Sequence, residues 1–218
     1  MKIKILLCIL LAEMLLVFSC DPIIDPVDPP VVVDPAGYTT IKFKGDDTGY
    51  VKLYTNDPGY TANGKTFWTA GNVSQDEGTY NVEIEAKKVS GSQDAGFGLI
   101  LCVQEEIDCF IMIQISVSGY YMIGKVVDGR PRTPFINDWE RCEDIKTNLN
   151  ETNKIRVAYN ETDSKFDLFI NDNPVCNFID NGAEPYYTDG RWGFIAEVSS
   201  LDDLPYVPVD VRFKDLTP

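Results

Sequence analysis

Alternation of apolar and polar residues with a period of two is the feature that most restricts the fold of this chain. The clearest case is the segment 80–87, where Val82 and Ile84 fall on one side and charged residues on the other. Side chains of a β-strand point alternately to opposite faces, so the segment predicts a half-buried strand. Two apolar runs, 97–103 and 109–117, predict a central hairpin covered on both faces.

The same signals recur along most of the chain and are separated by turn residues such as Asp128-Gly129. Beyond the first residues no 12-residue window has a clean helical period, and 143–150 is expected to form a short helical turn or a loop. The predicted fold class is all-β, an antiparallel β-sandwich of the jelly-roll kind. About a dozen strands are expected, among them 39–44, 50–54, 80–87, 97–103, 109–117, 120–127, 153–159, 165–170, 175–179, 190–198 and 207–213.

The N-terminal segment 1–19 predicts an export signal. Lys2 and Lys4 precede an apolar run that is too short to span a membrane as a helix. Residues 17–20 (Val-Phe-Ser-Cys) resemble the bacterial lipobox, which implies that Cys20 is lipidated; the alternative is an ordinary secretory signal with an incidental cysteine. We therefore expect an exported protein, lipid-anchored to the bacterial cell envelope, that meets the membrane through this anchor only.

The domain boundaries follow from composition. Asp-Pro recurs four times in 21–35, and proline favours extended backbone, so 20–36 is predicted to be a stiff Asp/Pro-rich tether. The remaining segment, 37–218, is predicted to be one sandwich domain.

Charge and the absence of histidine exclude several functions. The formal net charge is −15, which argues against a nucleic-acid partner and against flat docking on anionic lipid. Without histidine the chain has no Ser-His-Asp or Cys-His machinery and no histidine-ligated zinc. An enzyme built on this chain would depend on carboxylates, lysine or tyrosine.

Four cysteines remain after the export signal and Cys20. An even number in an exported chain predicts disulfides, with free thiols and a metal site as the alternatives. The first two flank the predicted central hairpin and are expected to face each other, which leaves the last two as the second pair. The four are Cys102, Cys109, Cys142 and Cys176.

Eight blocks of sequence are shared with a known family: 80–86, 96–100, 110–116, 119–124, 153–157, 169–175, 190–194 and 211–216. They resemble the concanavalin A-like lectin/glucanase sandwich, in its 3-keto-disaccharide hydrolase-like branch, which is also laminarinase-like. The resemblance implies a jelly-roll fold. It does not imply one activity, because this fold hosts lectins, glycosidases and adhesion modules.

The resemblance also implies places to look for carboxylate chemistry. Family-16 glucanases carry Glu, Asp and Glu on one strand, whereas here Glu83 and Glu85 are followed by Lys87, so the motif is incomplete and a solvated strand face is the simpler interpretation. No catalytic residue is predicted. Many relatives hold a structural calcium ion between the first and last strands, so a weak Ca²⁺ site is expected and no other cofactor. Its candidate ligands are Asp46, Asp47 and Asp215.

Aromatic rings near hydrogen-bonding groups are typical of carbohydrate sites, and the segment 130–139 combines arginine, aspartate and tryptophan unusually for so acidic a chain. An ordinary packed loop is the alternative. The leading hypothesis is a non-catalytic module that binds a glycan or a cell-surface protein; the others are a sugar hydrolase and a structural or adhesion domain. The candidate ligand-binding residues are Trp68, Tyr120, Arg130, Arg132, Asp138 and Trp139.

Overall fold

A computed structural model describes most of the chain from residue 36 onward. Every strand pair is antiparallel, and the described residues contain no helix. No helix in this part of the chain is therefore long and apolar enough to span a membrane. The described residues are 36–45, 50–53, 60–61, 65–75, 80–104, 109–128, 130–132, 135–160, 162–180, 187–199, 202 and 207–218.

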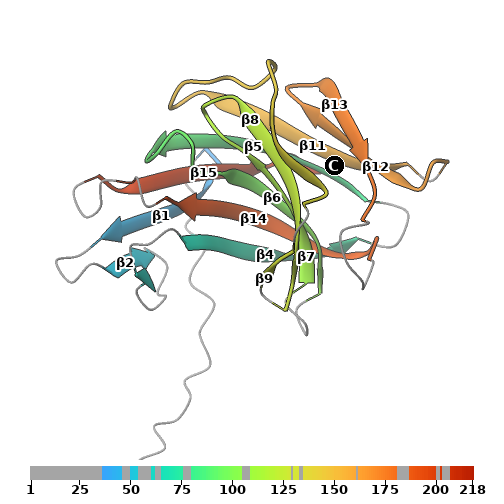
Figure 1. Cartoon of the computed structure of the whole chain (residues 1–218), viewed down its shortest axis with the longest axis horizontal. Coiled ribbons are helices and arrows are strands. Elements are labelled where there is room, and N and C mark those ends of the chain that lie inside the picture. Colours follow the sequence, from blue (N-terminus) through green and yellow to red (C-terminus); the bar gives the residue numbers. More distant parts are fainter. Residues whose placement is uncertain are drawn as a thin grey trace, which may run out of the picture.

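The first sheet has eight strands in the order β13–β12–β11–β5–β15–β1–β2–β3. Figure 1 shows β5, β15 and β1 side by side although they lie far apart in the sequence. The strands are β1 (Thr39–Gly45), β2 (Tyr50–Leu53), β3 (Tyr60–Thr61), β5 (Asn81–Ser90), β11 (Thr152–Asn160), β12 (Lys165–Ile170), β13 (Asn173–Phe178) and β15 (Val209–Asp215).

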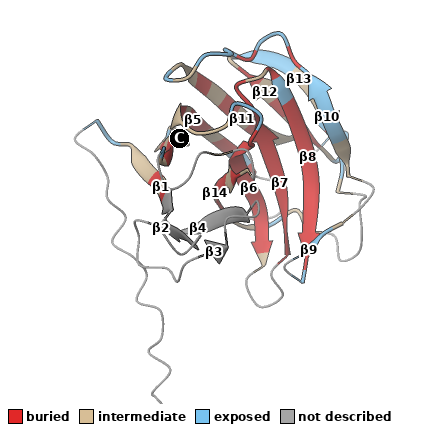
Figure 2. Cartoon of the chain, turned by 60° about the vertical axis from the view of Figure 1, so that its left-hand side comes forward, coloured by how far each residue is buried: buried red, intermediate tan, exposed pale blue. Residues whose placement is uncertain are grey.

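The second sheet has seven strands in the order β10–β8–β7–β6–β14–β4, with β9 paired to β8. Its central strands are buried along most of their length, whereas the edge strand β10 is exposed (Figure 2). The strands are β4 (Lys65–Gln75), β6 (Phe97–Gln104), β7 (Cys109–Ile115), β8 (Tyr120–Val127), β9 (Arg130–Pro131), β10 (Asn137–Arg141) and β14 (Gly190–Val198).

The main core lies between the two sheets and is built from alternate residues of their strands. Val82, Ile84 and Ala86 of β5 are buried and their neighbours are not, which confirms the predicted alternation. The buried residues of this core come from strands between Ile41 and Phe213. Burial of their apolar side chains between the sheets stabilises the fold. Together with the structural neighbours described below, the two sheets confirm the predicted sandwich.

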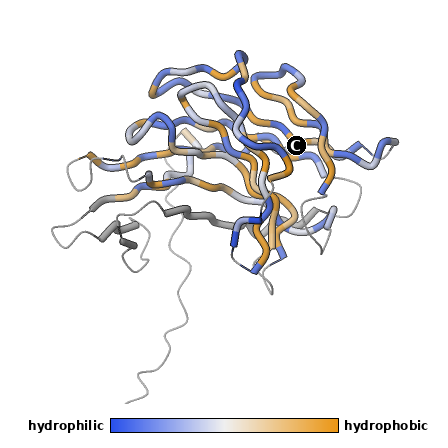
Figure 3. Tube along the Cα trace, in the orientation of Figure 1, coloured by the Kyte–Doolittle hydropathy of each residue, from blue (hydrophilic) through white to orange (hydrophobic). Residues whose placement is uncertain are grey.

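A second apolar cluster covers the outer face of the seven-stranded sheet, the face that points away from the other sheet. Ile100 pairs with Met112, and these side chains pack with Met122 and Ile195 under the partly buried Phe135. Orange segments of β6 to β8 show this apolar character (Figure 3). Because these residues are buried, packed side chains cover the described centre of this face.

Two segments differ from the expectations, and a third, 143–150, follows the loop alternative given for it. β4 was not among the expected strands, and the segment 130–141, expected to lie between strands, forms the edge strands β9 and β10. Residues 143–150 form turns without a helix.

The predicted disulfides are absent, and all four cysteines are free thiols. A bulge in β6 changes the register, so that Leu101 pairs with Ile111 but Gln104, not Cys102, pairs with Cys109. The two cysteines therefore do not face each other, and the expectation for this hairpin was wrong.

The second expected pair is also unbridged. Cys142 and Cys176 are both free thiols and form no disulfide with each other. Burial raises the pKa of both thiols above the ordinary value, which keeps them protonated near neutral pH.

Candidate functional site

Two of the predicted aromatic residues meet in one pocket at the end of the seven-stranded sheet. Tyr120 and Trp139 line a cavity of about 310 Å³ with Asp94, Ser116 and Ser118. We call these five residues the rim pocket. The two aromatic side chains are 37% and 36% exposed, which is unusual for large apolar groups and leaves their rings open to a ligand.

The turn between β7 and β8 forms the floor of the rim pocket. Gly119 has φ of 92°, a left-handed conformation that favours glycine, and its N–H donates to the Ser116 carbonyl oxygen at 3.1 Å. The Tyr120 N–H donates to Ser116 Oγ at 3.3 Å. The hydroxyl oxygens of Ser116 and Ser118 lie 2.8 Å apart; Ser116 is buried, so the partly exposed Ser118 is the serine of this turn that a ligand can reach.

The edge strand β10 brings Trp139 to the same place. Arg141 pairs with Tyr120 and Glu140 with Tyr121, after a register shift that falls between Asn137 and Glu140. The Tyr121 hydroxyl donates to Glu140 at 3.1 Å and fixes this end of β10. Trp139 itself falls within this register shift, and the pairing of the next two residues with β8 brings it to the pocket that Tyr120 lines.

The loop after β5 forms the remaining wall and supplies Asp94. The Ser118 N–H donates to the Gln93 carbonyl oxygen at 3.2 Å and ties this loop to the β7–β8 turn. Asp202 accepts the N–H of Ser92, which anchors the loop from its other side. These contacts fix the backbone of the loop that brings Asp94 to the pocket lined by Ser116 and Ser118.

A buried lysine supports the same loop from below. Lys88 is fully buried; its ammonium group donates to the Ala95 carbonyl oxygen at 2.9 Å and lies 5.8 Å from the centre of the Phe97 ring. Burial lowers the pKa of Lys88 to about 8, against the opposing effect of carboxylates that include Asp94. Lys88 is a positioning residue here, because it does not line the pocket.

The other candidates of the segment 130–139 do not line the rim pocket. Arg130 pairs with Val127 at the opposite end of β8, and Arg132 makes an ion pair with Asp128 at 3.6 Å. At about 3.3 Å per residue, that end of β8 is roughly 23 Å from Tyr120. Asp138 accepts the Trp139 N–H at 2.8 Å, so it orients the backbone of β10.

Trp68 and the calcium candidates are only partly described. Trp68 pairs with Ile195 in the seven-stranded sheet, but its side chain lies outside the described part of the structure. Asp46 and Asp47 also lie outside the described residues, and Asp215 accepts the Thr217 N–H at 2.8 Å. Within the described ranges no three His, Cys, Asp or Glu side chains are arranged to hold a metal, and the calcium site stays a prediction.

The strand carboxylates Glu83 and Glu85 belong to the outer face of the eight-stranded sheet. Glu83 lies 3.3 Å from Lys154 and 3.9 Å from Arg156, and Glu85 accepts the Tyr38 hydroxyl at 2.6 Å. Both carboxylates are engaged by neighbours on an open sheet face, which matches the solvated-face interpretation.

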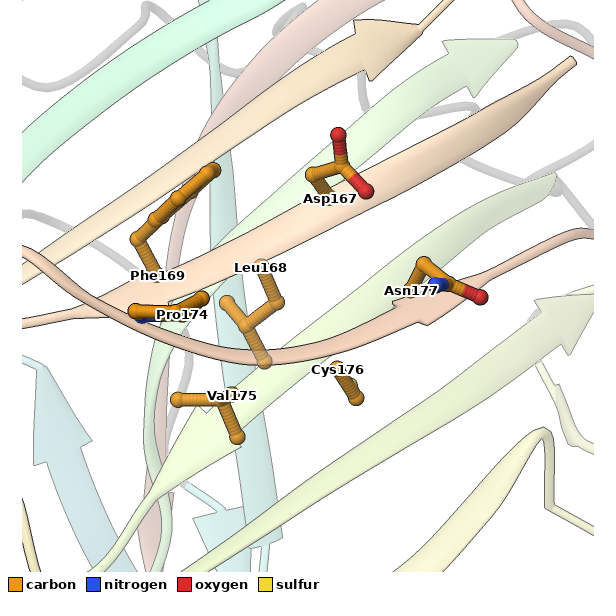
Figure 4. Close-up of a pocket in the computed structure, with 7 residues that line it drawn as sticks. All are labelled: Asp167, Leu168, Phe169, Pro174, Val175, Cys176 and Asn177. Atoms are coloured by element: carbon orange, nitrogen blue, oxygen red, sulfur yellow. The ribbon is translucent and has the colours of Figure 1, made fainter. Parts of the chain in front are cut away.

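A second pocket of about 300 Å³ lies on the β12–β13 hairpin at the edge of the eight-stranded sheet. Figure 4 shows Asp167 and Asn177 at one end of it and Phe169 with Pro174 at the other. The Arg156 guanidinium lies 3.6 Å from the centre of the Phe169 ring and covers one ring face. This pocket therefore offers less aromatic surface than the rim pocket.

Sequence reasoning missed three of the five rim-pocket residues: Asp94, Ser116 and Ser118. The serines stand in a Ser-Val-Ser-Gly turn, which is a recognisable turn signal. Nothing local places Asp94 beside them, because the contact joins two loops that are distant in sequence.

No family model matches this chain, and no curated protein matches its sequence. Solved structures match by shape. A native glycosidic hydrolase aligns with a TM-score of 0.50 and 10% identity over 82% of this chain and 76% of that one.

Two further structures are similar. The carbohydrate binding module CBM66 from Bacillus subtilis has a TM-score of 0.46 and 10% identity over 82% of this chain and 92% of that one. A β-1,3-1,4-glucanase (lichenase) from a mouse hindgut metagenome has a TM-score of 0.47 and 9% identity, with 82% and 80% covered. The chain has the concanavalin A-like sandwich fold, as the sequence predicted, and identities this low show the fold alone.

Proposed function

We propose that this chain is an exported bacterial lipoprotein, anchored through Cys20, whose sandwich domain binds a glycan in the rim pocket without catalysis. The observation that carries the proposal is the meeting of two exposed rings, Tyr120 and Trp139, with Asp94 and two serine hydroxyls. A sugar ring has apolar C–H faces and polar hydroxyl edges. The aromatic rings would cover the faces, and the Asp94 carboxylate and the Ser118 hydroxyl would bond to the edges, with Ser116 holding the Ser118 hydroxyl in place.

The carboxylate count supports binding over hydrolysis. Glycosidases use two carboxyl groups that flank the scissile bond, separated by roughly 5 to 9.5 Å. Among the described residues that line the rim pocket, Asp94 is the one acid. Sugar cleavage is the alternative function, because a glycosidic hydrolase has a similar fold. The experiment below also tests this alternative.

The test is retention of the chain without residues 1–19 on a glycan array and in polysaccharide affinity gels. Trp139→Ala is expected to weaken retention about tenfold, which corresponds to about 1.4 kcal/mol. Phe169→Ala, an aromatic change in the β12–β13 pocket, serves as the matched control and should bind as the parent does.

Three results would oppose the proposal. They are no retention on any glycan, equal retention of Trp139→Ala and the parent, or release of reducing sugar by the parent protein. The last result would favour the hydrolase alternative.

A further inference from the structure

The charges of this acidic chain are segregated between the faces of the fold. The outer face of the eight-stranded sheet carries seven described cations against five described carboxylates, whereas the whole chain has 34 acidic and 19 basic residues. Four of the carboxylates lie on strands, Glu83, Glu85, Asp167 and Asp210, and the fifth, Asp172, lies in the β12–β13 turn and makes an ion pair with Lys154 at 3.2 Å. We call this set of cations the basic face. They are Lys42, Lys87, Lys154, Arg156, Lys165, Arg212 and Lys214.

Strand pairing shows that these cations share one face. Lys154 and Lys214 both pair with Glu85, and Lys87 pairs with Arg212. Directly paired residues of an antiparallel sheet point to the same side. Lys87 and Arg212 therefore lie opposite each other as like charges; Arg212 is paired with Asp210 at 3.2 Å, whereas Lys87 makes no ion pair with a described residue.

The carboxylates do not neutralise the centre of this face. Glu85 accepts the Tyr38 hydroxyl at 2.6 Å. Lys87 and Lys214 lie 5.0 and 5.8 Å from the centre of the same Tyr38 ring. Neither lysine makes an ion pair with a described residue, so two ammonium groups remain available on either side of Tyr38.

The other carboxylates are used by the remaining cations. Glu83 is engaged by Lys154, and Asp210 lies 4.0 Å from Lys42 and 3.2 Å from Arg212. Among the described residues these carboxylates are therefore engaged by neighbouring cations, and Lys87 and Lys214 are the cations of the basic face that lie around Tyr38 without an ion pair to a described carboxylate.

We propose that the basic face docks on the anionic headgroups of a lipid bilayer. The cations are spread over β12, β11, β5, β15 and β1, a width of about 20 Å at 4.8 Å per strand, which fits a planar array of charges better than one small anion. The Debye length is about 8 Å at physiological salt and the sheets lie about 10 Å apart, so acids on the far side are largely screened.

The place where the chain enters the domain agrees with this orientation. Tyr38 immediately precedes β1 and lies on the basic face between Lys87 and Lys214. Any lipid anchor at Cys20 would reach the domain at this point. The net charge led us to expect no flat docking on anionic lipid; the segregation of charge revises that expectation, and the binding itself does not depend on the lipid anchor.

The experiment is co-sedimentation of the chain without residues 1–19, carrying Cys20→Ser, with vesicles of 70% phosphatidylcholine and 30% phosphatidylglycerol. We expect binding at 50 mM salt that weakens at least fivefold at 300 mM and is absent on pure phosphatidylcholine. The double variant Lys87→Glu/Lys214→Glu should lose binding at least tenfold.

The control is Arg130→Glu/Lys146→Glu, which changes the net charge equally at exposed positions off the basic face. Circular dichroism and thermal melting check that both variants fold. Equal losses in the two double variants, no binding by the parent, or binding to soluble heparin without binding to vesicles would each overturn the proposal. Glycan retention by these variants should not change, so this test is separate from that of the rim pocket.

Discussion

Lys88 is a fully buried lysine, so the cost of burying its charged form opposes the attraction of nearby carboxylates. A fully buried ammonium group is costly unless its hydrogen bonds and nearby carboxylates compensate, and here burial prevails. The lowering of its pKa from 10.5 to about 8 corresponds to about 3 kcal/mol that the folded state loses when Lys88 is charged. In return, the Lys88 ammonium group donates to the Ala95 carbonyl oxygen, and this hydrogen bond holds the loop that bears Asp94.

The pH dependence of stability tests this conflict. Between pH 8 and 10.5 the unfolded chain binds the Lys88 proton and the folded chain does not, so the Lys88 contribution to folding becomes more favourable as pH rises. The free energy of unfolding of the parent minus that of Lys88→Met is expected to increase by about 2 to 3 kcal/mol from pH 7 to pH 10, measured by urea denaturation. Taking the difference removes the tyrosines and thiols, which titrate in both proteins. A difference independent of pH would contradict the assignment.

At the scale of elements, close packing of β6 on β7 depends on a missing side chain. A Cβ atom added at Gly98 would lie 2.1 Å from the Ile113 carbonyl oxygen, which is backbone and can move only with its strand. Gly124, on the neighbouring strand β8, instead faces Met112 Cε at 2.5 Å, the flexible end of a side chain. The two glycines therefore tolerate a methyl group to different degrees.

Gly98→Ala is expected to destabilise the domain by about 2 kcal/mol or more, and Gly124→Ala by about 1 kcal/mol or less. Urea denaturation followed by tryptophan fluorescence measures both. Equal costs at the two positions would mean that β6 and β7 do not approach each other as closely as the structure shows.

Sequence reasoning found the strands that have an apolar pattern within their own residues. It missed features that depend on the position of a strand in the sheet. The alternation in β5 and the apolar run of β7 predicted strands at the right places. β10 carries exposed residues on both sides, because it is an edge strand, and so shows no alternation. The bulge in β6, which separates Cys102 from Cys109 in register, has no sequence signal that strand counting can detect.

At the scale of the whole molecule the two proposals use opposite sheets. The rim pocket belongs to one end of the seven-stranded sheet, and the basic face is the outer surface of the eight-stranded sheet. A domain that rested on a membrane through the basic face would keep the rim pocket clear of the lipid surface. Tyr120 and Trp139 were separate candidates in the sequence, whereas their meeting in one pocket, their polar neighbours and the segregation of charge emerge only from tertiary pairing.

The most direct test of the central claim is to map where a glycan binds. A ¹⁵N–¹H correlation spectrum of the domain, titrated with the strongest ligand from the array, reports each backbone amide separately. We predict shift changes concentrated at Asp94, at the turn from Ser116 to Tyr120 and at Trp139, with the β12–β13 hairpin unchanged. Changes confined to that hairpin, or no changes with any retained glycan, would contradict the assignment of the rim pocket as the binding site.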